Sequence, residues 1–202
     1  IKTKKVHRIS LSIVNTTTLK HTTATDLPGR YPVTSARGHK YIFILYNYDS
    51  NYIHGLPIKS RRSCHLVEAF RTCYAVLTSN EFAGKIVRLD NVISNAMVQH
   101  LQVNKLEHQL ASPSDHQTYY AKRAIQTYKN HFISGLCSTD THWSLQLWDE
   151  LTEQAITTLN MLQTSRVDPK KSEYEQLHGR KYDWNANMMA PPGTRAVIYG
   201  DA

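Results

Sequence analysis

Two aspartates that follow predicted strands are the residues of this chain best suited to chemistry. Asp26 ends the run 22–26, and Asp90 ends a later run, 64 residues further along. If the two strands are parallel neighbours in one sheet, both carboxylates reach the same edge. Two or three carboxylates at such an edge can hold divalent metal ions about 3.5 to 4 Å apart, the arrangement that phosphodiester chemistry uses. An aspartate at a strand end is also a common turn residue, so spacing alone leaves both interpretations open.

A basic stripe lies on a later predicted helix. Lys122, Gln126 and Lys129 stand at positions i, i+4 and i+7, so they share one helix face, with Arg123 beside them. Such a stripe suits contacts with the phosphates and sugars of DNA, although it equally fits a solvated helix face. A second basic group precedes it, and we leave open whether it serves binding or solubility: it comprises Arg37, Lys40, Lys59, Arg61 and Arg62.

Hydrophobic periodicity predicts the elements that position these side chains. The run 41–48 is continuously apolar and aromatic, which predicts a central strand covered on both faces. Period-two and turn signals predict further strands at 22–26, 51–58, 85–91 and 107–111. Apolar residues spaced by three and four predict a helix over 66–77, and Ser94 is the expected N-cap of a short helix.

Two long helices are predicted in the second half of the chain. The first spans about 118–136 and has an apolar stripe of Ala121, Ala124, Ile125, Tyr128 and Phe132. The second spans about 142–163 and carries Trp143 and Trp148 as packing residues. A linker and a terminal strand at 195–199 follow. Strands and helices in this order predict an α/β fold with a mixed sheet flanked by helices.

Composition narrows the class of protein. The 202 residues include 24 Lys and Arg against 16 Asp and Glu, a formal charge of +8, and 41% are hydrophobic. This apolar content is enough for a hydrophobic core and argues against disorder. The sequence contains no run of about 18 apolar residues, so no transmembrane helix is predicted. The positive charge favours a polyanionic partner, nucleic acid rather than membrane. The sequence contains no Gly-rich phosphate-binding loop, so it does not indicate a nucleotide cofactor.

The cysteines and the first residue suggest the context of the chain. Cys64, Cys73 and Cys137 form an odd set without Cys-x-x-Cys spacing, which argues against a disulfide framework or a zinc ribbon and favours a reducing intracellular compartment. The first residue is Ile1 rather than Met, so we expect a piece of a longer polyprotein. We expect a basic arm at 1–20, a core domain at 21–166 and a C-terminal extension at 167–202.

Several short segments of the sequence resemble the integrase core of copia-type retrotransposon polyproteins. They are Thr25-Asp26-Leu27-Pro28-Gly29-Arg30-Tyr31-Pro32, the run 40–48, Ile86-Val87-Arg88-Leu89-Asp90-Asn91 and the run 122–132. Later words resemble the segment that follows this core, namely Leu147-Trp148-Asp149, Thr158-Leu159-Asn160, Leu177-His178-Gly179 and Ala190-Pro191-Pro192-Gly193-Thr194. The order of these words over residues 22–199 is more specific than any one of them.

The resemblance implies a ribonuclease-H-like fold, DNA as partner, self-association, and a place in a cytoplasmic particle and the nucleus. It also implies an Asp, Asp, Glu triad that binds Mg²⁺ or Mn²⁺ and processes and joins DNA ends. Asp26 and Asp90 match the first two acids as catalytic and metal-binding residues. The third acid is expected in an Ala-Glu-Arg-Ala-Ile word, which here reads Ala121-Lys122-Arg123-Ala124-Ile125. Lys122 stands where the resemblance predicts glutamate.

This departure predicts an inactive triad. An ammonium in place of a carboxylate removes a metal ligand and repels a divalent ion some 4 Å away by several kcal/mol at an effective dielectric of about 20. Asp115 and Glu107 are the nearest acids in sequence that can substitute. Alternatively, Lys122 points outward and leaves a two-carboxylate site that binds one metal weakly. A catalytically dead nucleic-acid-binding or assembly module is the second functional hypothesis.

Overall fold

The structure is a computed structural model that describes residues 21–89, 94–110, 120–191 and 193–194. Its centre is a five-stranded sheet in the order β3-β2-β1-β4-β5. β1, β2 and β3 pair in antiparallel fashion, whereas β4 is parallel to β1 and β5 is parallel to β4. The strands are β1 (Thr22–Asp26), β2 (Tyr41–Asn47), β3 (Ile53–Ile58), β4 (Ile86–Leu89) and β5 (Glu107–Leu110). The predicted mixed sheet of about five strands is confirmed.

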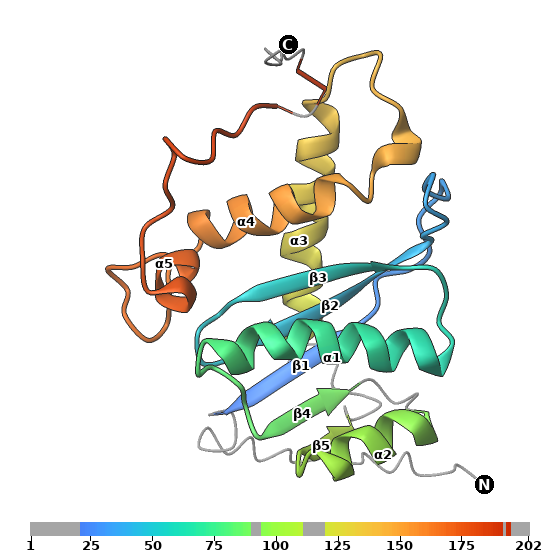
Figure 1. Cartoon of the computed structure of the whole chain (residues 1–202), viewed down its shortest axis with the longest axis vertical. Helices are drawn as coiled ribbons and strands as arrows, with labels where there is room; N and C mark the ends of the chain where they lie inside the picture. The colour runs from blue at the N-terminus through green and yellow to red at the C-terminus, as the bar shows by residue number, and fades with distance from the viewer. Residues whose placement is uncertain (1–20, 90–93, 111–119, 192, 195–202) are drawn as a thin grey trace, which may run out of the picture.

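Helices cover both faces of this sheet (Figure 1). One face packs on α1 (Ser63–Ser79) and α2 (Asn95–Val103), and the other packs on α3 (Tyr120–Cys137) and α4 (Leu151–Leu162). The predicted N-cap of α2 is confirmed, because the Ser94 side chain accepts a hydrogen bond from the Met97 backbone N–H. The result is a three-layer α/β architecture.

β2 shows why a continuous apolar run was needed. Ile42, Ile44 and Tyr46 belong to the core cluster beneath α3 and α4, whereas Phe43 and Leu45 belong to the cluster beneath α1 and α2. Successive strand side chains point to opposite faces, so burial on both sides requires every residue to be apolar. The prediction that this strand is central was wrong, because β1 occupies the centre. The chain leaves β3, crosses the sheet in α1 and returns as β4 on the far side of β1.

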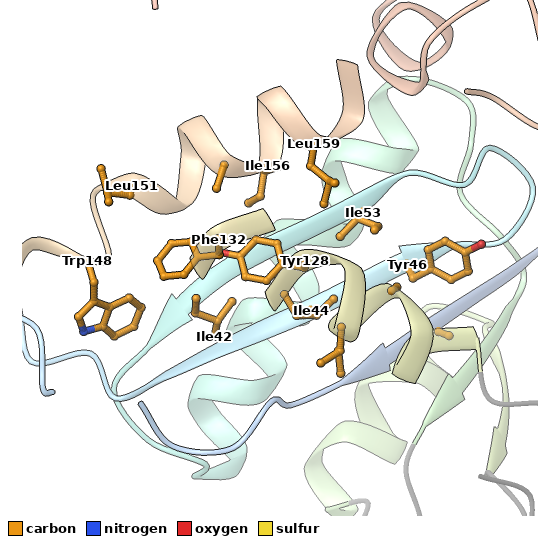
Figure 2. Packing of buried hydrophobic residues seen from close by; sticks show 14 residues of the cluster. Ile42, Ile44, Tyr46, Ile53, Tyr128, Phe132, Trp148, Leu151, Ile156 and Leu159 are labelled. Atoms are coloured by element: carbon orange, nitrogen blue, oxygen red, sulfur yellow. The ribbon is translucent and has the colours of Figure 1, made fainter. Parts of the chain in front are cut away.

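Aromatic side chains fill the space between the sheet and α4 (Figure 2). Tyr128 and Phe132 from α3 lie with Trp148 over Ile42 and Ile44. The rings of Phe132 and Trp148 meet edge to face, with their centroids 6.4 Å apart. This cluster anchors α3 to the sheet and thereby fixes the helix that carries the predicted basic stripe.

The second long helix is shorter than predicted. Helix α4 begins at Leu151, and residues 145–147 form one turn of 3-10 helix (η2, Leu145–Leu147), so both tryptophans precede α4. Polar side chains before it compete for backbone donors: Asp140 accepts from the His142 N–H, and Ser144 accepts from the Gln146 N–H. Such local bonds favour turns over a continuing α-helix.

A short helix follows that the sequence analysis did not predict. Helix α5 (Glu173–His178) begins with a capping box between Ser172 and Glu175 and ends at Gly179, whose φ of 68° is left-handed. Ser-x-x-Glu followed by a glycine is a recognisable signal for such a helix. Leu177 joins the core cluster beneath α1 and α2. Within the described part of the chain, no helix is both long enough and apolar enough to cross a membrane. The predicted arm at 1–20 and strand at 195–199 fall outside the described residues.

Candidate functional site at the carboxyl edge of the sheet

The two strands that lead to the predicted aspartates are parallel neighbours. Thr22 pairs with Ile86 and Ala24 pairs with Arg88, a constant offset of 64 residues, which equals the separation of Asp26 and Asp90 in the sequence. Asp26 is the last residue of β1, and β4 ends one residue before Asp90. The predicted adjacency of the strands is therefore confirmed. Asp90 lies outside the described residues, so its role stays a prediction.

Asp26 lies on the sheet face that α3 covers. Ala24 is buried in the cluster with α3 residues, and strand alternation puts Asp26, two residues on, on the same face. The Asp26 carboxylate is half-buried, and its Oδ1 atom accepts a 2.7 Å hydrogen bond from the Leu27 N–H. One oxygen of the carboxylate therefore stabilises the turn that follows β1.

Arg88 adds a cation that the sequence analysis missed. Its neighbours Val87 and Leu89 are buried beneath α1 and α2, so Arg88 points to the opposite face, beside Ala24 and diagonal to Asp26. Its Nε atom donates to Gln109 Oε1 at 3.3 Å. The sequence pattern could have revealed this. Arg88 lies between the apolar Val87 and Leu89 in a strand, and strand alternation therefore puts its side chain on the opposite face.

Helix α3 brings Lys122 to the same face of the sheet. The helix packs against β1, β2 and α4, and Lys122 is half-buried in its first turn. Arg123 and Gln126 are exposed, and Lys129 is half-buried. The apolar stripe opposite them is confirmed for every member that the structure describes, namely Ala124, Ile125, Tyr128 and Phe132. The predicted polar face therefore exists, and Gln126 uses its amide to donate to Asn130 at 2.8 Å.

The substitute acids do not complete a triad within the described chain. Glu107 is exposed and opens β5, where it pairs with Ile86, which in turn pairs with Thr22 at the opposite end of β1 from Asp26. Four residues of strand correspond to about 13 Å, so Glu107 lies far from Asp26. Asp115 falls outside the described residues. Glu107 is therefore excluded as the replacement acid.

The described part of the edge does not form a two-metal site. Among described residues, no group of three His, Cys, Asp or Glu side chains can hold a metal ion. The residues at hand are one carboxylate, Asp26, with two cations, Arg88 and Lys122, on the surrounding elements. Divalent metals of this class need several oxygen ligands.

Asp149 fixes the loop that follows Asp26. Its Oδ2 atom accepts from Ser35 Oγ at 2.9 Å and Arg37 Nε at 2.8 Å, and lies 2.6 Å from His39 Nδ1. Burial acts to raise the pKa of Asp149, but the hydrogen bonds from Arg37, His39 and Ser35 outweigh it and lower the pKa. The carboxylate therefore stays ionised and ties residues 35–39 to the segment before α4.

This contact also alters the second predicted basic group. Arg37 is paired through its Nε atom with the buried Asp149 carboxylate, although half of its side chain remains exposed. Arg61 lies over the Tyr41 ring, 5.6 Å from its centroid, and Lys59 and Arg62 are exposed. The group is thus divided between a structural ion pair and an open surface.

Two of the sequence segments that carry the family resemblance are in contact in the structure. Tyr31 stacks on Trp148 with ring centroids 4.3 Å apart, and the Trp148 indole N–H donates to the Val33 carbonyl at 2.9 Å. Asn160 is fully buried and brackets Ile53, accepting from its N–H at 3.0 Å and donating to its carbonyl at 2.7 Å. These motif residues hold the loop after β1 and the edge strand in place. Their role in this chain is structural.

The fold is similar to those of solved retroviral integrase cores. The HTLV-2 integrase catalytic core domain, solved in complex with magnesium in a trimeric form, matches with a TM-score of 0.59 and 16% identity, over 79% of this chain and 97% of that chain. The BIV integrase catalytic core domain matches with a TM-score of 0.57 and 12% identity, over 79% and 95%. A chain of a simian T-cell lymphotropic virus intasome matches with a TM-score of 0.62 and 13% identity, over 90% of this chain and 60% of that chain.

No family model matches the sequence, and no curated protein matches it. At 12 to 16% identity, the structural likeness establishes the fold. The chain therefore has the ribonuclease-H-like fold of retroviral integrase catalytic cores, as the resemblance predicted.

Proposed function

We propose that this chain is the integrase core of a retrotransposon polyprotein, that it binds DNA, and that Lys122 leaves it without strand-transfer activity. The observation that carries the proposal is the parallel pairing of β1 with β4 in a sheet on which α3 packs through β1 and β2. In this arrangement Asp26 ends β1, the chain position after Leu89 follows the neighbouring parallel strand β4, and Lys122 belongs to the helix that packs on β1 and β2. The likeness to integrase cores supports the assignment at the level of fold.

DNA binding is supported by charge. The chain carries a formal charge of +8, and Lys122, Arg123 and Lys129 are cationic residues on α3. Cations on one helix contribute affinity for phosphates without reading sequence. We therefore expect binding that depends strongly on salt and weakly on base sequence.

The loss of chemistry follows from the same helix. If metal ions were to bind at Asp26 and Asp90, they would supply Lewis acidity for attack on phosphorus. Lys122 offers no ligand oxygen and adds positive charge where a carboxylate is required. Arg88 raises the positive charge of this face further. Asp26 then serves the turn at Leu27, and the cations serve phosphate contacts.

Electrophoretic mobility of a labelled duplex across a salt series tests the binding claim. We expect Lys129→Gln to weaken binding and to reduce the slope of log K against log salt by about one unit, as the loss of one phosphate contact requires. Arg71→Gln is the matched control, because Arg71 is exposed on α1, on the other side of the sheet, where it pairs with Glu68. Absence of binding at low salt, or equal losses in the two variants, would contradict the proposal.

The second hypothesis, a nucleic-acid-binding or assembly module, predicts the same binding. It differs in the response to Lys122→Glu. A decayed enzyme gains affinity for Mn²⁺ when the missing acid is restored, because the other ligands are still arranged for it. A module whose site has been rebuilt gains none.

A further inference from the structure

A small pocket opens between the β2–β3 turn, α3 and the segment that follows α4. Its volume is about 100 Å³, and it is lined by two arginines, four neutral polar residues and the apolar Ile53 and Ala124, with no acid among them. The residues that matter here are Tyr46, Asn51, Arg123, Thr127, Gln163 and Arg166. We propose that this pocket binds a single phosphate group.

Arg166 is held in position before any ligand arrives. Its Nη1 atom donates to the Tyr48 carbonyl at 3.1 Å, and its guanidinium lies over the Tyr48 ring, 4.4 Å from the centroid. The Arg166 backbone N–H also donates to the Ser50 carbonyl. A guanidinium carries five N–H donors, so this anchoring uses few of them. An ordered arginine loses little side-chain entropy when it binds an oxyanion.

Arg123 supplies the second charge from α3. It is exposed, and within the described chain no carboxylate lies within 4.0 Å of its guanidinium. The two arginines are 43 residues apart in the sequence and meet at one small cavity. Two guanidinium groups around a cavity without an acid create a positive potential that only an anion relieves.

The neutral polar side chains of the lining are largely bonded to one another and to the backbone. The Tyr46 hydroxyl donates to Asn51 Oδ1 at 2.8 Å, and Asn51 Nδ2 donates to Gln163 Oε1 at 3.3 Å. This chain of bonds uses the amide oxygens as acceptors within the lining. The group that remains on Gln163 is its Nε2 amide, a donor. The preference for a ligand with acceptor oxygens therefore rests on the two arginines, with Gln163 Nε2 as an additional donor.

The nearest buried acid does not cancel this charge. Glu173 is fully buried, and burial raises its pKa to about 8, although Arg166 acts in the opposite direction. Burial thus favours the neutral form of this carboxyl group, and Glu173 itself does not line the pocket. The cavity is large enough for a small tetrahedral oxyanion, because about 10–15 Å³ of such volume already holds one water.

The phosphate has two possible sources, the backbone of a nucleic acid or free inorganic phosphate. The nucleic-acid source rests on the proposed function, whereas binding of free phosphate does not. The test measures the melting temperature of the full chain with inorganic phosphate and with chloride at equal ionic strength. We expect phosphate to stabilise the protein more than chloride does, as a ligand of the folded state must.

Substitutions of the two arginines test whether this pocket is the phosphate-binding site. Arg123→Gln is exposed and is expected to lower phosphate affinity at least about tenfold. Arg166→Lys keeps the charge but loses the planar fork, so a smaller loss is expected. Arg71→Gln makes the same charge change on the opposite face and is expected to leave phosphate binding unchanged. Equal stabilisation of all variants, or no excess of phosphate over chloride, overturns the proposal.

Binding of duplex DNA to the same variants distinguishes the two sources of the phosphate. If the backbone supplies the phosphate, Arg166→Lys weakens DNA binding and free phosphate competes with the duplex. If free phosphate is the ligand, the variants lose phosphate binding while Arg166→Lys binds DNA as the unaltered chain does. Both outcomes support the pocket. Failure of DNA binding with phosphate binding retained contradicts the proposed function and leaves this inference intact.

Discussion

The two faces of the sheet are closed by different kinds of contact. Beneath α1 and α2 the core consists of apolar side chains such as Phe70, Leu77 and Leu101. Beneath α3 and α4 an aromatic cluster is joined by buried polar links, among them Asn160 bonded to Ile53 and Asp149 bonded to the loop after β1. The first face is held mainly by filled apolar volume, although Asn47 and Tyr74 also donate there to the Phe82 and Gly84 carbonyls. The second also fixes directions, and it carries the candidate site and the phosphate pocket.

The largest expected effect is on the apolar face. Phe70 is fully buried in α1, where it stacks on Tyr74. We expect Phe70→Ala to lower the free energy of unfolding by about 3 to 5 kcal/mol, because it removes apolar contacts and leaves a cavity. Urea denaturation measures the loss. Phe70→Leu is the matched control and should cost clearly less, and equal losses would contradict a role based on filled volume.

On the polar face, Asn160 gives the sharper test. Replacing it with alanine leaves the Ile53 N–H and carbonyl without their buried partners. We expect a loss of about 2 to 4 kcal/mol in the free energy of unfolding, because each buried polar group left unsatisfied costs about 1 to 3 kcal/mol. The control is Asn104→Ala, since the exposed Asn104 amide bonds only within and next to its own helix. If the two variants lost equal stability, the claimed difference between the faces would be wrong.

Glu173 gives a smaller effect that depends on pH. Burial raises the pKa of Glu173 from 4.5 to about 8, so the folded chain holds this proton more tightly than the unfolded chain. Stability from this group is therefore full below about pH 4.5 and is lost as the pH rises toward 8. Glu173→Gln should remove this dependence and raise stability at pH 8 by about 1 to 3 kcal/mol.

Urea denaturation at pH 5 and pH 8 measures this linkage. The control is Glu175→Gln, because Glu175 lies on the same helix but serves in its capping box. A variant at position 173 that loses stability at both pH values would contradict the account.

Local signals predicted most of the fold. The run 41–48, the helical spacing over 66–77 and the cap at Ser94 are each encoded within a few residues, and each was confirmed. The start of α4 was wrong because Trp148 and Asp149 are held by Val33 and Ser35, more than 110 residues away. No periodicity encodes such a contact. The centre of the sheet was also misassigned, since strand order depends on a crossover and not on how apolar one strand is.

The candidate site was predicted only in part, because here too local spacing is encoded in the sequence and tertiary contacts are not. The parallel adjacency behind Asp26 was a condition that the sequence argument assumed and the structure supplies, whereas the polar face of α3 followed from helical spacing. Arg88 was missed although alternation predicts its direction. The pairing of Arg37 with Asp149 and the meeting of Arg123 with Arg166 depend on tertiary packing, which spacing along the chain does not encode.

The central claim is that Lys122 separates DNA binding from DNA joining. The direct measurement is Mg²⁺- or Mn²⁺-dependent strand joining of a labelled duplex by the unaltered chain and by Lys122→Glu, with Mn²⁺ affinity measured on both. The account predicts that the unaltered chain binds the duplex but joins none of it, and that Lys122→Glu binds Mn²⁺ more tightly. Strand joining by the unaltered chain would contradict the account, because a lysine in the first turn of α3 would then be compatible with a working metal site.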